Sequence, residues 1–277
     1  MPEAIRVLEM ARETAVQAGD RNSESRITGL LGQNQMAAGD LISAQSKFEE
    51  SLRIDAVTGD RRHEGAIRAQ LATICLIRGQ YHEAIEMLEK SIEATKNTSS
   101  EATEMFRRGL IGQAYIGLKD SDKALEFIRQ ALAFAEKTGR KTNECIWRGN
   151  MGEIYLDLGK YDTALDWFNQ AQEFAVEMKD RDCESAWMGL KGEALLGLGR
   201  QEEAVTLLET ALDLAMDIKS TVAERRNRLG LGKALIAIGM KDKAVPHLER
   251  ALEITKAMGM TSVLVDEVES VLGQVKE

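Results

Sequence analysis

The sequence predicts an all-α fold in which pairs of antiparallel helices repeat along the chain. Proline, which interrupts helices, occurs only at Pro2 and Pro246 among the 277 residues. Alanine, leucine, glutamate and lysine, which favour helices, are abundant. The sequence also resembles itself when it is shifted by 40 residues, and a period between about 20 and 50 residues is typical of stacked structural units. We therefore expect an α-solenoid of about 14 helices, built from stacked antiparallel hairpins.

The second helix of each repeated unit is marked by three positions. An alanine comes first, a bulky apolar residue follows four residues later, and a small residue follows three residues after that. These positions hold Ala4, Ala44, Ala84, Ala124, Ala164, Ala204 and Ala244, then Leu8, Phe48, Leu88, Ile128, Phe168, Leu208 and Leu248, and finally Ala11, Ser51, Ser91, Ala131, Ala171, Ala211 and Ala251. Because residues at i, i+4 and i+7 share one face of a helix, we predict that this face is buried.

The first helix of each unit carries a central glycine. The position holds Gly32, Gly112, Gly152, Gly192 and Gly232, with Ala72 as the exception. Glycine inside a helix costs about 1 kcal/mol relative to alanine, so we expect this position to allow close approach of the two helices. A second set of small residues marks the turn between them, where a helix ends in a left-handed conformation. This set comprises Gly39, Gly79, Gly159, Gly199 and Gly239, with Lys119 as the exception.

Residues Gly152 to Ala171 carry the pattern Gly-x-x-Tyr followed by Leu-Gly-x-Tyr-x-x-Ala-x-x-x-Phe-x-x-Ala. This pattern resembles the tetratricopeptide repeat, and the 40-residue period resembles the longer variant of that repeat. The resemblance covers nearly the whole chain. It implies a right-handed superhelical α-solenoid whose inner wall is built from the first helices. Lys191 departs from the pattern, since its equivalents in the other units are the apolar residues Leu31, Leu71, Ile111, Met151 and Leu231.

The repeated positions also predict the boundaries of the units. We expect a single array over residues 1–277, with an unpaired second-type helix at 1–20, complete repeats at 21–60, 61–100, 101–140, 141–180, 181–220 and 221–260, and a C-terminal capping helix at 261–277. The capping helix is predicted to bury Val268, Val271 and Val275.

The unpaired helix at 1–20 would expose Ala4, Leu8 and Ala11 unless another element covers them. Two explanations remain open at this point. The chain is a fragment of a longer array, or this end docks a partner or a second copy of the chain to form a homodimer.

The composition argues against several classes of function. The formal net charge of -9 disfavours a general nucleic-acid binder, which needs a basic face. Cys75, Cys145 and Cys183 suit neither a disulfide framework nor a CxxC metal site, as expected in a reducing compartment. No apolar run reaches the roughly 18 residues of a membrane span, and the first ten residues are too charged for a signal peptide. We therefore predict a cytoplasmic protein that does not bind membranes.

The sequence does not predict an active site. His63, His82 and His247 lie in three different units at unrelated positions, so they indicate neither a triad nor a metal cluster. Residues 230–233 resemble a phosphate-binding loop only in part, because Ala234 stands where serine or threonine would bind magnesium. We therefore predict a protein that is not an enzyme and has no metal and no cofactor.

Glutamate occupies the first turn of all six complete first helices. The residues are Glu24, Glu64, Glu104, Glu144, Glu184 and Glu224. A carboxylate there complements the helix dipole. In four units an arginine follows at i+4, which predicts an ion pair worth about 0.2 to 0.5 kcal/mol. We interpret this row as structural.

The inner wall implied by the resemblance is the candidate binding surface. Positions one and two before the central glycine, and one and four after it, are predicted to lean toward the groove. The candidates for this wall are Arg26, Gln33, Met36, Gln70, Thr73, Phe106, Leu110, Gln113, Ile116, Ile146, Asn150, Glu153, Leu156, Glu193, Arg226 and Lys233, of which Arg26, Phe106, Ile146 and Arg226 lie six residues before the glycine. Their amides, carboxylates and cations are able to bind a peptide through hydrogen bonds and ion pairs.

A neighbouring position is small in every unit but the last, and we expect it to let a bound backbone approach the wall. It holds Gly29, Ala69, Gly109, Gly149, Gly189 and Leu229. Two pairs of large residues also share positions, namely Trp147 with Trp187 and Ile27 with Ile67, and we predict that they pack between neighbouring units.

Three functions remain under consideration. The leading hypothesis is an adaptor or scaffold that binds a peptide or protein segment in this groove. The first alternative is a regulatory or sensing domain of a larger signalling or effector protein. The second alternative is a scaffold that self-assembles through the helix at 1–20.

Overall fold

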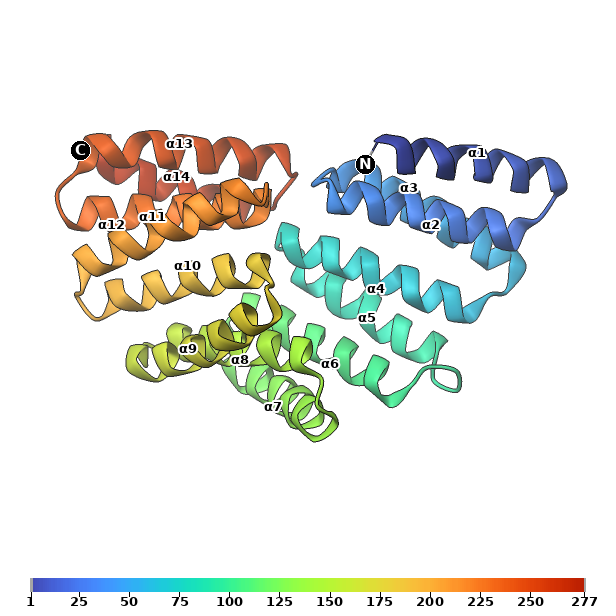
Figure 1. The fold of residues 1–277 in the computed structure, drawn as a ribbon, viewed down its shortest axis with the longest axis horizontal. Helices are drawn as coiled ribbons and strands as arrows, with labels where there is room; N and C mark the ends of the chain where they lie inside the picture. Colours follow the sequence, from blue (N-terminus) through green and yellow to red (C-terminus); the bar gives the residue numbers. More distant parts are fainter. Residues whose placement is uncertain (1, 277) are drawn as a thin grey trace. The chain divides into compact units, whose positions relative to one another are not determined.

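The computed structural model describes residues 2–276 of the protein. These residues form fourteen α-helices, and no strand occurs among them (Figure 1). The all-α prediction is therefore confirmed. The helices belong to two compact units, Met1–Ala114 and Tyr115–Glu277.

The first unit consists of consecutive helices that pack in sequence order. It contains α1 (Pro2–Ala18), α2 (Arg21–Ala37), α3 (Leu41–Thr58), α4 (Arg61–Arg78), α5 (Tyr81–Ala94) and most of α6 (Glu101–Gly117). Each helix from α1 to α4 contacts the next, and the first helices α2 and α4 also contact each other.

The second unit has the same local arrangement. It contains α7 (Ser121–Thr138), α8 (Lys141–Asp157), α9 (Tyr161–Met178), α10 (Arg181–Gly197), α11 (Gln201–Asp217), α12 (Thr221–Ala237), α13 (Lys241–Ala257) and α14 (Ser262–Lys276). Consecutive helices pack together, and the first helices form a second row in which α8 contacts α10 and α10 contacts α12. This row places equivalent residues of successive repeats next to one another.

The turn between the two helices of a repeat has the predicted left-handed residue. The φ angles are 82° at Gly39, 77° at Gly79, 69° at Gly159, 74° at Gly199, 79° at Gly239 and 59° at Lys119. In the third repeat, Lys119 therefore adopts the left-handed backbone conformation that glycine has at this position in the other repeats. The sequence analysis did not predict the aspartates that follow two of these turns and accept a backbone N–H at the start of the next helix, as Asp40 does from Ser43 at 3.0 Å and Asp120 does from Lys123 at 3.2 Å.

The central glycine of the first helix lies against the bulky residue of the second helix, as predicted. A Cβ atom added at Gly152 would lie 2.6 Å from Cε1 of Phe168, and one added at Gly192 would lie 2.5 Å from Cγ of Leu208. A Cβ atom at either glycine would therefore overlap the partner side chain unless that side chain or the helices shift. The bulky residues themselves have no exposed surface at Phe48, Leu88, Ile128, Phe168, Leu208 and Leu248.

The first and last described helices differ in burial. At α14, Val268 and Val271 are buried and Val275 is partly buried against the core of the second unit, so the predicted apolar contacts of this helix are present. At α1, Ala4 is exposed, while Leu8 and Ala11 are only partly buried.

The glycine contact leads to a test with a matched control. We expect Gly152→Ala to destabilise the second unit by about 1 to 3 kcal/mol, because the new methyl group overlaps the Phe168 ring in a packed core. Gly273→Ala in α14 meets no atom within 4 Å and should stabilise by up to about 1 kcal/mol through helix propensity. Thermal and urea unfolding followed by circular dichroism measure both effects. Equal melting temperatures for the two variants would contradict the proposed role of the central glycine.

Candidate protein-binding face

The candidate residues of the second unit come from three first helices that pack side by side. Glu153 of α8, Glu193 of α10 and Lys233 of α12 occupy equivalent positions, and Arg226 lies two turns before Lys233. All four side chains are partly exposed. We call these four residues the first-helix face.

Lys233 and its carboxylate neighbours form one end of the first-helix face. Its Nζ atom donates to Oε1 of Glu267 in α14 at 2.9 Å. Burial by itself would lower the pKa of Lys233, but the carboxylates of Glu193 and Glu267 outweigh it and raise this pKa above its usual value. The ammonium group of Lys233 is therefore protonated at neutral pH, and the carboxylates of Glu193 and Glu267 already neutralise its charge.

Glu153 differs from Lys233 because no hydrogen bond or ion pair reaches it among residues 2–276. Burial raises the pKa of this carboxyl group, and the positive charge of Arg226 only partly opposes the shift. Nearby Asp157 raises the pKa further. An ionised Glu153 would therefore be stabilised by a cationic or N–H donor group from a ligand.

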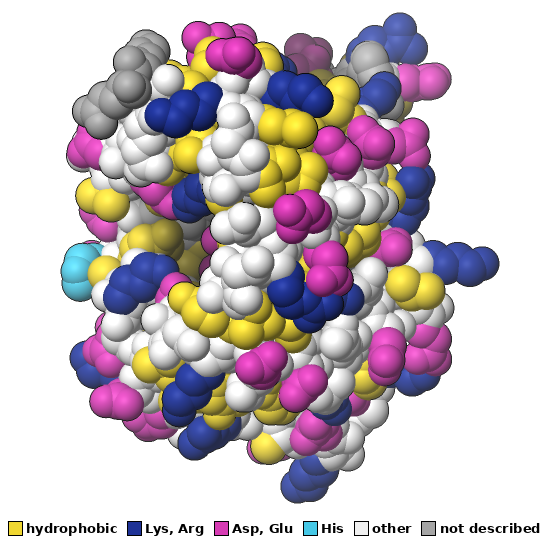
Figure 2. Space-filling model, turned by 90° about the vertical axis from the view of Figure 1, so that its left-hand side faces the viewer, with side chains coloured by type: hydrophobic (Ala, Val, Ile, Leu, Met, Phe, Trp, Pro, Cys, Tyr) yellow, Lys and Arg dark blue, Asp and Glu magenta, His cyan; other side chains and the backbone are white. Residues whose placement is uncertain are grey.

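Charges of both signs are spread over the surface of the molecule. On the face shown in Figure 2, basic and acidic side chains are interspersed, and neither sign gathers into a large patch. The ion pairs among the described residues are mostly at least partly exposed, as in Arg12 with Glu50 and Lys256 with Glu269. Each such pair therefore contributes about 1 kcal/mol or less.

The other candidates differ in accessibility. Exposed side chains are Arg26 and Gln33. Partly buried side chains are Met36, Gln70, Thr73, Phe106, Gln113, Ile146 and Leu156. Leu110, Ile116 and Asn150 are buried, with 7%, 4% and 1% of their surface exposed, so they offer little area to a partner in this structure. Both amide atoms of Asn150 are nevertheless without a hydrogen-bond partner among the described residues.

The small position of the first helices does not leave room for a bound backbone, so that expectation is wrong. A Cβ atom added at Gly149 would lie 2.4 Å from the ring of Trp187, and one added at Gly29 would lie 2.7 Å from Cδ1 of Ile67. The space is filled by the large residue of the next first helix. The predicted packing role of Trp187 and Ile67 is therefore confirmed.

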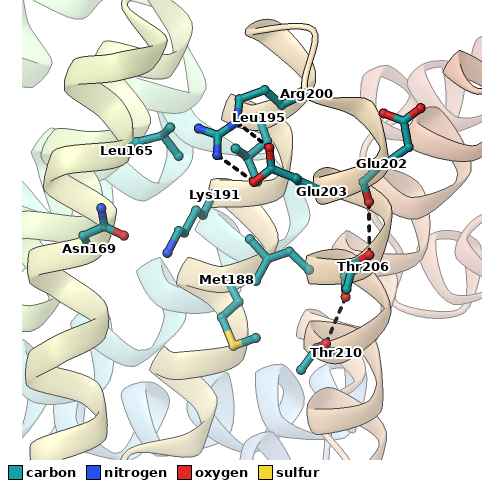
Figure 3. Close-up of a pocket in the computed structure, with 11 residues that line it drawn as sticks. Leu165, Asn169, Met188, Lys191, Leu195, Arg200, Glu202, Glu203, Thr206 and Thr210 are labelled. Atoms are coloured by element: carbon teal, nitrogen blue, oxygen red, sulfur yellow. Dashed lines mark hydrogen bonds and ion pairs between the residues drawn. The ribbon is translucent and has the colours of Figure 1, made fainter.

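The glutamate row has the structural role that its spacing predicted. The distances between glutamate oxygen and arginine nitrogen are 2.8 Å for Glu64 with Arg68, 2.8 Å for Glu104 with Arg108, 3.6 Å for Glu144 with Arg148 and 2.8 Å for Glu224 with Arg228. The fifth repeat has no such pair because Met188 follows Glu184 at i+4. A pocket, which the sequence analysis did not predict, lies beside Met188 (Figure 3).

A model of the tetratricopeptide repeat matches residues 24–97, 63–137, 142–217 and 182–257, which together make up more than half of the sequence. The chain belongs to the tetratricopeptide repeat family. No curated protein matches the sequence significantly.

Solved structures of other tetratricopeptide-like proteins resemble this fold. A Rap protein complexed with competence and sporulation factor has a TM-score of 0.67 at 13% identity, and the match covers 99% of this chain and 86% of that protein. The Rap conjugation gene regulator of the plasmid pLS20, in complex with the Phr* peptide, has a TM-score of 0.69 at 12% identity, with coverage of 94% and 76%. A tetratricopeptide repeat protein from Parabacteroides merdae has a TM-score of 0.60 at 16% identity, with coverage of 99% and 100%.

In the first unit of this tetratricopeptide repeat protein, a side-chain cluster has the composition of a catalytic triad. In the first unit, Ser25 Oγ donates to Asp55 Oδ1 at 2.6 Å, and His63 Nδ1 lies 2.9 Å from Asp55 Oδ2 and 3.3 Å from Ser25 Oγ. A triad uses one imidazole nitrogen for the acid and the other for the nucleophile, whereas Nδ1 of His63 meets both partners here. Ser25 and Asp55 are also buried. The cluster therefore joins α2, α3 and α4.

Two cysteines of the second unit, Cys145 and Cys183, lie next to each other among packed helices. Cys145 Sγ donates to the carbonyl oxygen of Ala171 at 3.2 Å and accepts from Nε1 of Trp187 at 3.4 Å. The contact between the two thiols raises the pKa of Cys183, which burial raises further, and lowers the pKa of Cys145. The residues in 2–276 contain no group of three or more potential metal ligands, and none of their helices is long and apolar enough to span a bilayer.

The environment of Glu153 predicts a dependence of stability on pH. The pKa of Glu153 is 4.5 in the unfolded chain and higher in the folded protein. Between these two pKa values, folding takes up a proton, so stability falls as the pH rises through this window. Above it, the ionised carboxylate destabilises the fold. We expect Glu153→Gln to raise the melting temperature at about pH 7 and to have little effect near pH 4. Glu173→Gln, at an exposed position of α9, is the control. A gain from Glu153→Gln that is equal at both pH values would contradict this interpretation.

Proposed function

We propose that this protein is a non-catalytic interaction module that binds a peptide or protein segment on the first-helix face. The observation that carries this proposal is the row of partly exposed charged groups from α8, α10 and α12, in which Glu153 has no direct partner among the described residues. Polar groups that are held in place by packed helices lose little freedom when they bind a partner.

The charges of the first-helix face favour a partner of mixed charge. Glu153 suits a cationic side chain or a backbone N–H, because these groups would stabilise its ionised form. Arg226 is a donor suited to a carboxylate. Lys233 is less available, since Glu267 already accepts from its ammonium group. The complex of the Rap conjugation gene regulator with the Phr* peptide supports the proposal, because it is an example of this fold with a bound peptide.

A selection experiment with a peptide library tests this function. Random linear peptides displayed on phage are selected on the full-length protein, and the enriched peptides are measured by fluorescence anisotropy. We expect the double variants Glu153→Lys with Glu193→Lys, and Arg226→Glu with Lys233→Glu, to weaken binding about tenfold or more, since each reverses two charges at the contact. Helical content is checked by circular dichroism.

The matched control reverses two charges elsewhere in the second unit. Glu126→Lys in α7 and Glu249→Lys in α13 change exposed residues of second helices and should leave the affinity unchanged. If both variants of the first-helix face bind the enriched peptides as tightly as the wild type does, that face is not the binding surface.

Self-assembly through α1 is a second candidate, favoured by the apolar surface of that helix. Val7 and Met10 are 56% and 62% exposed, and Leu8 is only partly buried. Clusters of exposed apolar residues commonly mark interaction surfaces. We expect a dimer that forms with increasing concentration in light scattering and is lost in Leu8→Glu and in Met10→Glu. A constant monomer mass over the measured concentrations would exclude this candidate.

A further inference from the structure

The pocket in the second unit lies on the side of α10 that faces away from the first-helix face. It has a volume of about 700 Å³ and lies between the second helices α9 and α11, with α10 beneath it (Figure 3). Lys191 contributes to this pocket, whereas Glu193 belongs to the first-helix face. Two residues apart on an α-helix differ in direction by about 200°, so the two surfaces are separate.

The pocket lies where Met188 replaces an arginine that four of the other five repeats have, the first repeat having Thr28 there. The equivalents of Met188 are Arg68, Arg108, Arg148 and Arg228 in four repeats, and each of them pairs with the glutamate four residues earlier. Met188 cannot form this pair, and its side chain is buried in the pocket floor. With Leu165 and Leu195 it gives the pocket an apolar base.

Beside the pocket, Lys191 and Gln172 form a polar pair at two positions that are apolar in the other complete repeats. Lys191 replaces a buried apolar residue of the first helix, and Gln172 replaces a leucine or isoleucine of the preceding second helix. The equivalents of Gln172 are Leu52, Ile92, Leu132, Leu212 and Leu252. Nζ of Lys191 donates to Oε1 of Gln172 at 3.4 Å, which is a long hydrogen bond to a neutral group.

Lys191 therefore has a positive charge without a carboxylate partner among the described residues. Figure 3 shows its side chain directed toward α9, beside the apolar floor. Arg200 does not share this property, because its guanidinium group pairs with Glu203 at 2.6 Å at one end of the pocket. An anionic group of a ligand would complement Lys191.

The α11 side of the pocket offers hydrogen-bond acceptors. The hydroxyl of Thr206 donates to the carbonyl oxygen of Glu202 at 3.1 Å, and that of Thr210 donates to the carbonyl oxygen of Thr206 at 2.9 Å. Their donor hydrogens are used, so the oxygen lone pairs remain for N–H groups of a ligand. A peptide has such N–H groups in its backbone, whereas a fatty acid has none.

We propose that this pocket binds a protein segment in which a bulky apolar side chain stands next to a carboxylate. The apolar side chain packs on Leu165, Met188 and Leu195, and the carboxylate, from aspartate, glutamate or the C-terminus of the segment, pairs with Lys191. Backbone N–H groups of the segment donate to Thr206 and Thr210. This site is independent of the function proposed for the first-helix face, and the two surfaces are able to bind different segments.

The binding test uses two pools of short fluorescein-labelled peptides with the full-length protein. In the acid pool, leucine, isoleucine, methionine or phenylalanine stands next to aspartate, glutamate or a free C-terminal carboxylate. In the amide pool, asparagine, glutamine or a C-terminal amide replaces the acid. Fluorescence anisotropy should show members of the acid pool binding about tenfold more tightly than their amide counterparts, because only they pair with Lys191.

Two variants introduce, at positions 191 and 188, residue types that other repeats have at the equivalent positions, so both variants should fold. Lys191→Leu should remove the preference for the acid pool, and Met188→Arg should fill the pocket and prevent binding of either pool. Lys137→Leu in α7 removes one exposed positive charge and should change nothing. The variant Glu153→Lys with Glu193→Lys should also bind the acid pool normally, which separates this site from the first-helix face.

A measurement on the unaltered protein complements the variants. With ¹³C-methyl-labelled methionine, the signal of Met188, assigned from its loss in Met188→Leu, should shift on titration with acid-pool peptides. Equal binding of the two pools, no binding of either, or equal effects of Lys191→Leu and Lys137→Leu would overturn the proposal. A Met188 shift with octanoate but not with any peptide would also overturn it, because the occupant would then be a small carboxylate.

Discussion

The contact between the central glycine of a first helix and the bulky residue of its partner is the constraint on which the rest of the structure depends. At Gly152 and Phe168, the missing Cβ atom lets the aromatic ring lie directly on the helix backbone. This contact fixes the separation of the two helices within a repeat. Because the same contact recurs at Gly192 and Gly232, successive hairpins of the second unit have similar dimensions, and equivalent residues of α8, α10 and α12 come to lie in one row.

The sequence correctly predicted the features that arise from contacts within a single pair of helices. Helix periodicity, the turn conformation at Gly159 and its equivalents, and the Glu64–Arg68 type of ion pair all follow from residues a few positions apart. Expectations drawn from the sequence were wrong where the structure depends on the packing of one hairpin against the next. The expectation that Gly149 would leave open space was wrong because the rotation between hairpins brings Trp187 onto it. A periodic pattern contains no direct information about that rotation.

The burial of Asn150 has the same origin. Its position relative to the central glycine predicted an exposed side chain, but neighbouring first helices pack closely enough to cover it. Glu153 lies one helical turn further on, where it remains partly exposed, and its carboxyl group meets both burial and the field of Arg226. Fewer of the candidate residues are therefore accessible than the sequence predicted, and the accessible ones in the second unit include the charged residues of the first-helix face but not the small position.

A repeated structure makes local departures informative, since each repeat serves as a reference for the others. Positions such as Gly152 are constrained by packing, and a change there alters the fold. Met188, Lys191 and Gln172 differ from their equivalents, yet α10 keeps its length and its contacts with α9 and α11. The cost of these substitutions is local, because the lost apolar contacts and the lost arginine pair lie on α10 and on the adjoining helix α9. Met188 and Lys191 line one pocket, and Gln172 accepts a hydrogen bond from Lys191 beside it. Because the residues of the other repeats would serve folding equally well, these changes support the ligand proposed for the pocket.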